Sequence, residues 1–392
     1  MSDQPMFAGR MDLGRQGIKT QRLSAKAPVR HIDLALLLTT IGLTICGAYA
    51  VNSASQPRLR AIGSDPHFFL KRQLIYVALA SIVFLVTLLF DYRQARALGP
   101  IVFGLNLLLL VVVLTPLGHS ALGAQRWIDL GVLQVQPSEL MKVILIGTLA
   151  SLFIVESYPR EGLVRVLFAM VITVVPAFLI FLQPDLGTVM VLFAIVFAML
   201  LVSGTRIRWL LLVLVAGVMA LGLALQVGVL KDYQVARLTA FLDSSSDPQR
   251  AGFNLAQSKI AIGSGGLTGK GSQASSQTNL AYVPQQHTDF IFTAIGEQRG
   301  FLGAIVVIGL FALLLWRSIR IAFVSKDLFG TMLASGIAAM FAFQVFVNIG
   351  MTVGIMPITG IPLPFVSYGG SSLITSYVAV GLLMNVHMRR FT

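Results

Sequence analysis

Residues 166–203 read VLFAMVITVVPAFLIFLQPDLGTVMVLFAIVFAMLLVS, and this stretch decides the class of fold. It carries a single charged side chain, Asp185, within the break Gln183-Pro184-Asp185-Leu186-Gly187. A membrane-spanning helix needs about 20 apolar residues, so the stretch is nearly twice the length of one span. The polar break therefore predicts two spans that are joined by a short turn at one membrane surface.

The rest of the chain has the same character. Apolar residues make up 56% of the 392 and charged residues 11%, whereas soluble domains carry about 25% charged residues. We therefore expect an all-α polytopic membrane protein with about ten transmembrane helices. The apolar segments lie near 33–51, 73–90, 99–116, 137–155, 166–182, 186–203, 209–229, 288–316, 328–348 and 371–387.

Lys and Arg indicate the orientation of these segments. Most of the formal charge of +13 lies in connections on one side, apart from a first outside loop that holds Arg58, Arg60, Lys71 and Arg72. The positive-inside rule then places both termini in the cytoplasm, and the charge needs no nucleic acid partner. Residues 1–30 are basic and lack a signal peptide, which predicts a disordered cytoplasmic tail before one membrane domain, 31–392.

Residues 230–287 are expected to form one long extracytoplasmic loop between the seventh and eighth helices. The loop is polar and rich in Gly and Ser, including Gly263-Ser264-Gly265-Gly266-Leu267. Loops of this length are usually functional or disordered. The glycines lack the Walker spacing, so we reject a nucleotide site. Cys46 is the only cysteine, which excludes an intrachain disulfide.

Glu139 and Lys142 form the first candidate pair. Pro137 suits the first turn of a helix, which places Glu139 near the positive end of the helix dipole. Lys142 lies three residues further, on the same helix face. An ionisable residue inside a span is costly and indicates function, although a purely structural ion pair is the alternative.

Asp185 and Asp289 are the other candidate carboxylates. Asp185 has two possible roles, as a helix N-cap before Leu186 or as a functional group. Asp289 enters an apolar helix at the outer surface, where desolvation raises the pKa of a carboxyl and makes it a better general base. A cap is again the alternative for Asp289, with Thr288 as a competitor.

Several cations are expected on the same side as these acids, namely Arg126, Arg237, Lys259 and Lys270. A lipid pyrophosphate needs such groups, and Arg suits bidentate contacts with phosphate. Headgroup binding and structural ion pairs are the alternatives. His287 is predicted to be neutral or a weak base, and the sequence shows no zinc pattern.

Six motifs resemble the SEDS proteins (shape, elongation, division and sporulation), from about residue 30 to the C-terminus. They are Gly123-Ala124-Gln125-Arg126-Trp127-Ile128, Gln136-Pro137-Ser138-Glu139-Leu140-Met141-Lys142, Gln183-Pro184-Asp185-Leu186-Gly187-Thr188, Ala261-Ile262-Gly263-Ser264-Gly265-Gly266-Leu267, His287-Thr288-Asp289-Phe290-Ile291-Phe292 and Pro362-Leu363-Pro364-Phe365-Val366-Ser367-Tyr368-Gly369-Gly370-Ser371-Ser372. The sequence of residues 348–364 is more similar to the elongation-type members of the family, RodA, than to the division-type members, FtsW. The run Gly296-Glu297-Gln298-Arg299-Gly300 departs from the family, and we expect Arg299 to pair with Glu297.

The resemblance implies a peptidoglycan glycosyltransferase with ten helices in the bacterial cytoplasmic (inner) membrane and an active site on the extracytoplasmic side. Its substrate would be lipid II, an undecaprenyl-pyrophosphate disaccharide-pentapeptide. Asp289 matches the family's catalytic residue, and Glu139 and Lys142 match positions in a cavity linked to the site. Arg126, Asp185 and Arg237 match recurrent positions.

The resemblance also implies a divalent cation, Mg or Mn, and partners in the elongation machinery, above all a class B penicillin-binding protein that crosslinks the product. A lipid II flippase or other transporter is the main rival interpretation, because broken helices and intramembrane ions also mark transporters. A division-type polymerase and a non-enzymatic scaffold for the penicillin-binding protein are further alternatives.

Overall fold

The computed structural model describes residues 31–121, 124–129, 131, 134–154, 162–228, 230–242, 251–280 and 286–390. The predicted basic tail, 1–30, lies outside the described residues. Its cytoplasmic position therefore stays a prediction.

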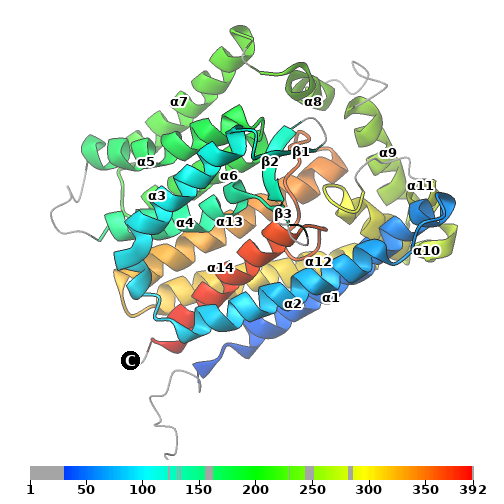
Figure 1. Ribbon diagram of the computed structural model, residues 1–392, viewed down its shortest axis with the longest axis horizontal. Coiled ribbons are helices and arrows are strands. Elements are labelled where there is room, and N and C mark those ends of the chain that lie inside the picture. The colour runs from blue at the N-terminus through cyan, green and yellow to red at the C-terminus, as the bar shows by residue number, and fades with distance from the viewer. Residues whose placement is uncertain are drawn as a thin grey trace, which may run out of the picture.

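Most of the described chain is helical, as expected. Ten long helices correspond to the ten predicted apolar segments: α1 (Leu34–Ala61), α2 (Phe68–Leu89), α3 (Gln94–Leu114), α4 (Pro137–Leu152), α5 (Leu163–Leu182), α6 (Leu186–Val202), α7 (Ile207–Gln226), α12 (Ile291–Val324), α13 (Leu328–Val353) and α14 (Gly370–Met388). Figure 1 shows α1, α2, α12 and α14 running in similar directions along the molecule.

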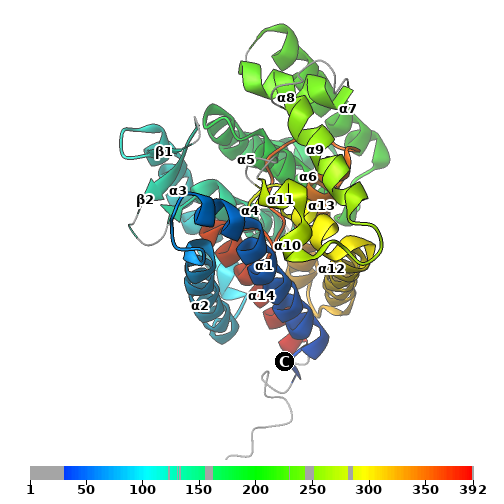
Figure 2. The ribbon, with the colours of Figure 1, turned by 90° about the vertical axis from the view of Figure 1, so that its right-hand side faces the viewer.

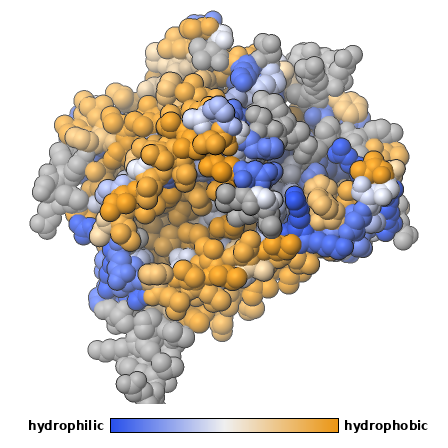
Figure 3. Space-filling view, viewed as in Figure 1, coloured by the Kyte–Doolittle hydropathy of each residue, from blue (hydrophilic) through white to orange (hydrophobic). Residues whose placement is uncertain are grey.

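Eight of these helices are long and apolar enough to cross a membrane. The other two, α4 and α6, have 16 and 17 residues, so ten spans remain a prediction. The outer surface of the helices is suited to contact with lipid, because it exposes large apolar side chains. Leu89 and Phe323, for example, are 81% and 85% exposed. Figure 3 shows broad apolar flanks of this kind. The chain is a multi-pass membrane protein.

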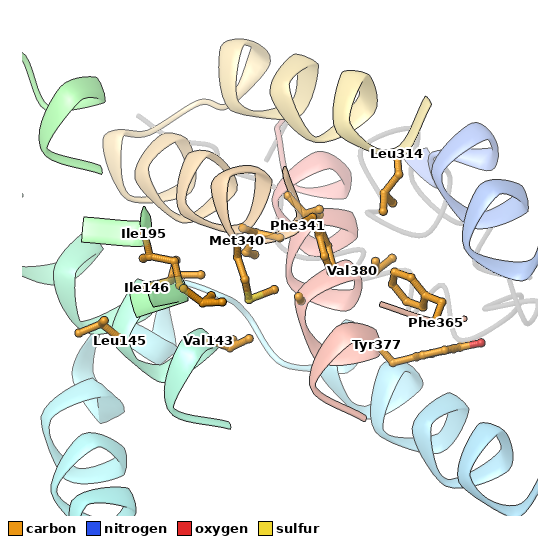
Figure 4. Close-up of a cluster of buried hydrophobic side chains, with 14 of the residues drawn as sticks. Val143, Leu145, Ile146, Ile195, Leu314, Met340, Phe341, Phe365, Tyr377 and Val380 are labelled. Carbon is orange, nitrogen blue, oxygen red and sulfur yellow. The ribbon is translucent and has the colours of Figure 1, made fainter. Parts of the chain in front are cut away.

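The core lies around α13 and α14, the two long helices that are most deeply buried. Figure 4 shows side chains of α4, α6, α12, α13 and α14 meeting there. Phe365, in the segment between α13 and α14, packs with its ring centroid 5.6 Å from Phe341 and 5.8 Å from Tyr377. This packing fixes the α13–α14 segment against the core.

A small sheet that was not predicted from the sequence joins α3 to α4. Strands β1 (His119–Ala121), β2 (Ala124–Asp129) and β3 (Gln134–Val135) pair in that order, and both pairings are antiparallel. Pairing of these strands, which have two to six residues, satisfies backbone hydrogen bonds outside the helices. The sheet positions Arg126 on β2.

The expected loop 230–287 is largely helical where it is described. It contains α8 (Asp232–Leu242), α9 (Ala251–Ser264), α10 (Gly271–Ala274) and α11 (Ser276–Asn279). Figure 2 shows α8, α9, α10 and α11 above and beside the ends of the long helices.

The glycine-rich segment packs closely against α12. It lies against a break in α12 at Gly300, where φ is +61°. A β-carbon on Gly265 would lie 2.0 Å from the Gly296 carbonyl oxygen, so a side chain there is excluded. The amide of Phe301 donates to the Gly266 carbonyl (2.8 Å). The segment therefore replaces helix hydrogen bonds that the break removes.

The expected pairing of Arg299 with Glu297 is wrong. Glu297 is fully buried and accepts hydrogen bonds from the amides of Gln277 and Thr278, both at 2.9 Å. Arg299 instead lies over the Tyr49 ring, with its guanidinium carbon 4.6 Å from the ring centroid. A buried carboxylate needs hydrogen-bond donors, and backbone amides supply them to Glu297. The long side chain of Arg299 instead extends to an aromatic face near the surface.

Candidate active site

Three helices begin at one end of the bundle, and their first residues form the candidate site. Pro137 is the first residue of α4, Leu186 of α6 and Ile291 of α12. The helix starts direct unpaired backbone N–H groups and the positive ends of their dipoles to this end. The site is therefore suited to anionic groups before any side chain is considered.

Asp185 is an N-cap and also an ion-pair partner. Its carboxylate accepts from the Thr188 amide (3.2 Å) and from the Thr188 hydroxyl (2.9 Å). Arg126 Nη1 lies 3.8 Å from Asp185 Oδ1, and Gln136 donates to Oδ2 at 3.2 Å. Arg126 Nε also donates to the Gln183 carbonyl (2.9 Å). The sheet is thus held against the Gln-Pro break that the sequence singled out.

Asp289 and Arg237 face the same glycine. A β-carbon on Gly360 would lie 3.3 Å from Oδ2 of Asp289 and 3.4 Å from Nη1 of Arg237. The φ of Gly360 is +75°, so glycine also suits the backbone. The Tyr233 hydroxyl, on α8 like Arg237, donates to the Pro184 carbonyl (3.0 Å). This bond brings α8 to the start of α6.

The protein surroundings of Asp289 favour the protonated, neutral carboxyl, compared with an aspartate in water. Burial raises the pKa of the Asp289 carboxyl above its ordinary value, while the charges of Arg237 and Arg126 pull that pKa down in part. Asp185 is close enough to raise it further. A carboxylate with a raised pKa is a stronger base, which agrees with the predicted role in proton transfer.

Two polar side chains bind the backbone of the Asp289 turn. Asn348, on α13 and fully buried, donates to the Asp289 carbonyl (2.9 Å) and to the Ile361 carbonyl (2.7 Å). The Ser367 hydroxyl donates to the Thr288 carbonyl (2.6 Å). Neither Asn348 nor Ser367 was predicted to have a role in the site. An asparagine inside an apolar helix was the signal that could have found Asn348, because polar groups in a span need partners.

Glu139 and Lys142 form an ion pair inside the bundle, and their functional role stays a prediction. Lys142 Nζ lies 2.7 Å from Glu139 Oε2, and the two residues are only 3% and 2% exposed. Ser138, beside Glu139, lies with its hydroxyl 3.5 Å from Asp185 Oδ2. The pair therefore follows directly, along α4, on the residue that contacts Asp185.

His287 lies in an aromatic cluster. Its ring centroid is 4.5 Å from Phe69 and 5.7 Å from Tyr368. Burial and the charge of Arg58 lower the pKa of His287 to about 4, so the ring is neutral at pH 7. The Tyr368 amide donates to the His287 carbonyl (3.0 Å). These contacts anchor the turn that carries Asp289.

Two predicted cations lie away from the carboxylates. The Lys259 side chain covers Gly354 at the end of α13, and Lys270 belongs to the glycine-rich segment, where its amide donates to the Glu297 carbonyl. Within the described ranges, no three His, Cys, Asp or Glu side chains are grouped as a metal site. Mg²⁺ usually binds through one or two carboxylates plus substrate phosphates, and Asp185 and Asp289 fit such partial ligation.

Comparison with known proteins gives consistent matches. A family model described as "Cell cycle protein", FTSW_RODA_SPOVE, matches residues 34–391. The probable peptidoglycan glycosyltransferase FtsW of Trichlorobacter lovleyi is 40% identical over 360 residues, covering 90% of this chain and 92% of the relative. The peptidoglycan glycosyltransferase MrdB of Escherichia coli K12 is 36% identical over 362 residues, covering 92% and 94%.

Solved structures show a similar fold. A chain of a peptidoglycan synthase complex that coordinates polymerization and crosslinking matches with a TM-score of 0.76 and 31% identity, over 92% of this chain and 98% of that one. The rod shape determining protein RodA of Thermus thermophilus matches with a TM-score of 0.68 and 31% identity, again over 92% and 98%.

Proposed function

The chain belongs to the FtsW/RodA/SpoVE (SEDS) family and is a peptidoglycan glycosyltransferase, and from this premise we propose that it polymerises lipid II with Asp289 as general base. One observation carries the proposal. The Asp289 carboxylate and the Arg237 guanidinium both lie beside Gly360, and the charges of Arg126 and Asp185 act on the same carboxyl.

In the proposed reaction the C4 hydroxyl oxygen of the acceptor sugar attacks the anomeric carbon of the donor. The bond from that carbon to the pyrophosphate oxygen breaks, and the hydroxyl proton passes to Asp289. Undecaprenyl pyrophosphate leaves as an anion. One carboxylate is sufficient because pyrophosphate is a good leaving group, whereas glycoside hydrolases need a second carboxyl as acid.

Arg126 and Arg237 are proposed to bind the phosphates. Both cations act on the Asp289 carboxyl, and guanidinium groups suit bidentate contacts with phosphate oxygens. Fixed positive charge beside the departing group stabilises the transition state without reorganisation. A divalent cation, Mg or Mn, would be held by Asp185, Asp289 and the substrate and would neutralise pyrophosphate charge.

We place the site at the extracytoplasmic surface of the bacterial inner membrane, with both termini in the cytoplasm. Arg93, Arg96, Lys326 and Arg389 lie at the opposite end of the bundle, which the positive-inside rule assigns to the cytoplasm.

We further propose a role in elongation with a class B penicillin-binding protein as partner. The RodA-like sequence of residues 348–364 supports a role in elongation. The match to a chain of a peptidoglycan synthase complex supports such a partner. Relatives named FtsW support the division-type alternative. Depletion of the protein from cells would distinguish the two roles. Rounded cells would indicate a role in elongation, and filamentous cells a role in division.

Purified full-length protein in liposomes with lipid II is expected to produce glycan strands. The measurement is gel separation of the products. Movement of lipid II across the bilayer without strand formation would favour the flippase alternative and contradict the polymerase.

The pH dependence of polymerisation is expected to follow Asp289. The base acts in its deprotonated form, so the rate falls as pH drops through a pKa that lies above the ordinary value. Arg237→Gln removes the main charge that lowers this pKa, so the acid limb of the pH–rate profile should move to higher pH. Lys259→Gln is the matched control, and an unmoved limb in Arg237→Gln would exclude the assigned electrostatic role.

The orientation is tested by labelling an introduced cysteine. Ser275 would be the natural choice from its place in the predicted loop, but the structure buries it completely, whereas Ser272 is exposed. Ser272→Cys in a Cys46→Ala background should react with an impermeant thiol reagent in intact spheroplasts. Ser275→Cys is the buried control. Labelling of Ser272→Cys only after lysis would reverse the topology.

A further inference from the structure

Arg299, the unusual cation of α12, lies where that helix breaks at Gly300. About 25 residues of α12 follow the break as far as Val324, and a rise of about 1.5 Å per residue gives them a length of roughly 37 Å. The hydrocarbon core of a bilayer is about 30 Å thick, so Arg299 lies near the boundary between hydrocarbon and headgroups. It is not among the charges that act on Asp289, and the proposed reaction gives it no role.

The Arg299 side chain is held against α1 and remains exposed. A β-carbon on Gly303 would lie 2.2 Å from Cβ of Arg299, so the glycine leaves room for the stem of the arginine. The guanidinium carbon lies 4.6 Å from the ring centroid of Tyr49, which is itself exposed. Within the described ranges, Arg299 forms no salt bridge and no side-chain hydrogen bond. A guanidinium over an aromatic face keeps its N–H donors for a further, anionic partner.

Lys270 supplies a second cation to the same corner of the molecule. The residue before it packs on α12, because a β-carbon on Gly269 would lie 2.6 Å from Cα of Arg299. The Lys270 amide donates to the Glu297 carbonyl (3.0 Å), which fixes the backbone of this residue two positions from Arg299. Lys270 is exposed and has no salt bridge to a described carboxylate.

The acids that are nearest in sequence to these two cations are engaged or distant. Glu297 accepts from two backbone amides, and Asp65, in the connection after α1, pairs with Lys71 at 2.6 Å. Residues 243–250 lie outside the described ranges and precede α9, whose 14 residues span about 20 Å before the glycine-rich segment begins. The described structure therefore offers the two cations an opening for an external anion.

An apolar seam between α1 and α12 leads away from the two cations. The helices pack side by side, as Figure 2 shows, and Gly42 of α1 lies against Leu310 of α12 (3.6 Å from a β-carbon on the glycine). Ile45 and Val306 lie about one turn nearer to Arg299 on each helix, and both are exposed. Tyrosine and arginine side chains above such a surface are typical of a membrane interface. A ligand that matches both features has an anionic head and a hydrocarbon tail.

We propose that Arg299 and Lys270 bind the phosphate of an anionic phospholipid whose acyl chains lie along the seam between α1 and α12. Charge complementarity supports this occupant, because basic side chains beside transmembrane helices attract anionic headgroups. A free phosphate shares the headgroup chemistry but gains nothing from the apolar seam. In the proposed orientation the lipid belongs to the outer leaflet of the membrane. The site thus gives a function to the arginine that departs from the family pattern.

The test is native mass spectrometry of the full-length protein in detergent, titrated with phosphatidylglycerol or with phosphatidylethanolamine of the same acyl chains. Phosphatidylglycerol should bind more tightly, because only its headgroup carries a net negative charge. A cation near a membrane surface contributes about 1 kcal/mol to the binding of anionic lipid, which is roughly fivefold in affinity. Arg299→Gln should therefore weaken the first binding event by about fivefold, and Arg299→Gln with Lys270→Gln by about 25-fold.

Arg320→Gln is the matched control, because Arg320 is an exposed arginine over an aromatic ring, Trp316, at the opposite end of the same helix. Arg299→Lys keeps the charge and should bind phosphatidylglycerol within about twofold of the unmodified protein. Equal affinity for the two lipids, or an equal loss in Arg320→Gln or Arg299→Lys, would refute the site. Displacement of the lipid by glycerol 3-phosphate at similar concentration would contradict a role of the apolar seam. Tighter binding of undecaprenyl phosphate would assign the site to a lipid carrier and overturn the phospholipid as occupant.

Discussion

Asp289→Asn is expected to abolish glycan polymerisation while the protein still binds lipid II. Asparagine keeps the shape of the side chain, so the turn held by Asn348 and Ser367 remains in place. It cannot accept the acceptor hydroxyl proton, and general base catalysis contributes about 10²- to 10⁴-fold. The rate of strand formation from lipid II in liposomes should therefore fall by at least about 100-fold.

The control is Asp129→Asn, on β2 near the same surface. Asp129 is exposed, and its carboxylate accepts from the Gly131 amide (2.8 Å), so a neutral side chain there should leave the rate within about twofold. Binding is measured separately with fluorescent lipid II. Wild-type polymerisation by Asp289→Asn would remove this residue from the role of base, and lost binding would make it a substrate ligand instead.

The helices could be predicted from sequence because the hydrocarbon of a bilayer allows the backbone few conformations. Every backbone group inside the bilayer must be bonded within its own helix, so apolar length alone located the helices that surround Asp185. Outside the bilayer this constraint is absent. The pairing of Asp129 with Gln134 in the sheet, and the helices within 230–287, depend on packing against distant elements.

The residues of the candidate site could be predicted where a scarce residue type stood at a costly position, such as an acid at the start of an apolar helix. Scarce acids at the starts of helices identified Asp185, Glu139 and Asp289, and the structure brings Asp185 and Asp289 to the same cluster as Arg126. For Arg299, sequence proximity suggested Glu297 as the partner, but the partner is Tyr49, about 250 residues away. Cation–π contacts between distant segments leave no local pattern.

Lys142→Met is expected to reduce both stability and polymerisation. The substitution leaves Glu139 buried without its partner, and breaking a buried pair from one side costs about 3–5 kcal/mol. A protein with a typical stability of 5–15 kcal/mol would lose a large part of it. The measurements are the midpoint of thermal unfolding in detergent and the rate of strand formation from lipid II.

The double variant Glu139→Gln with Lys142→Met separates structure from function. It removes both charges, and replacing a buried pair by neutral groups is often neutral or stabilising, so the unfolding midpoint should recover. Polymerisation should stay about 100-fold low, because the pair supports the turn whose Ser138 lies against Asp185, and misplacement by about 1 Å can cost that much. If instead the double variant regains both stability and rate, the pair serves packing alone and the Asp289 end of the site functions without it.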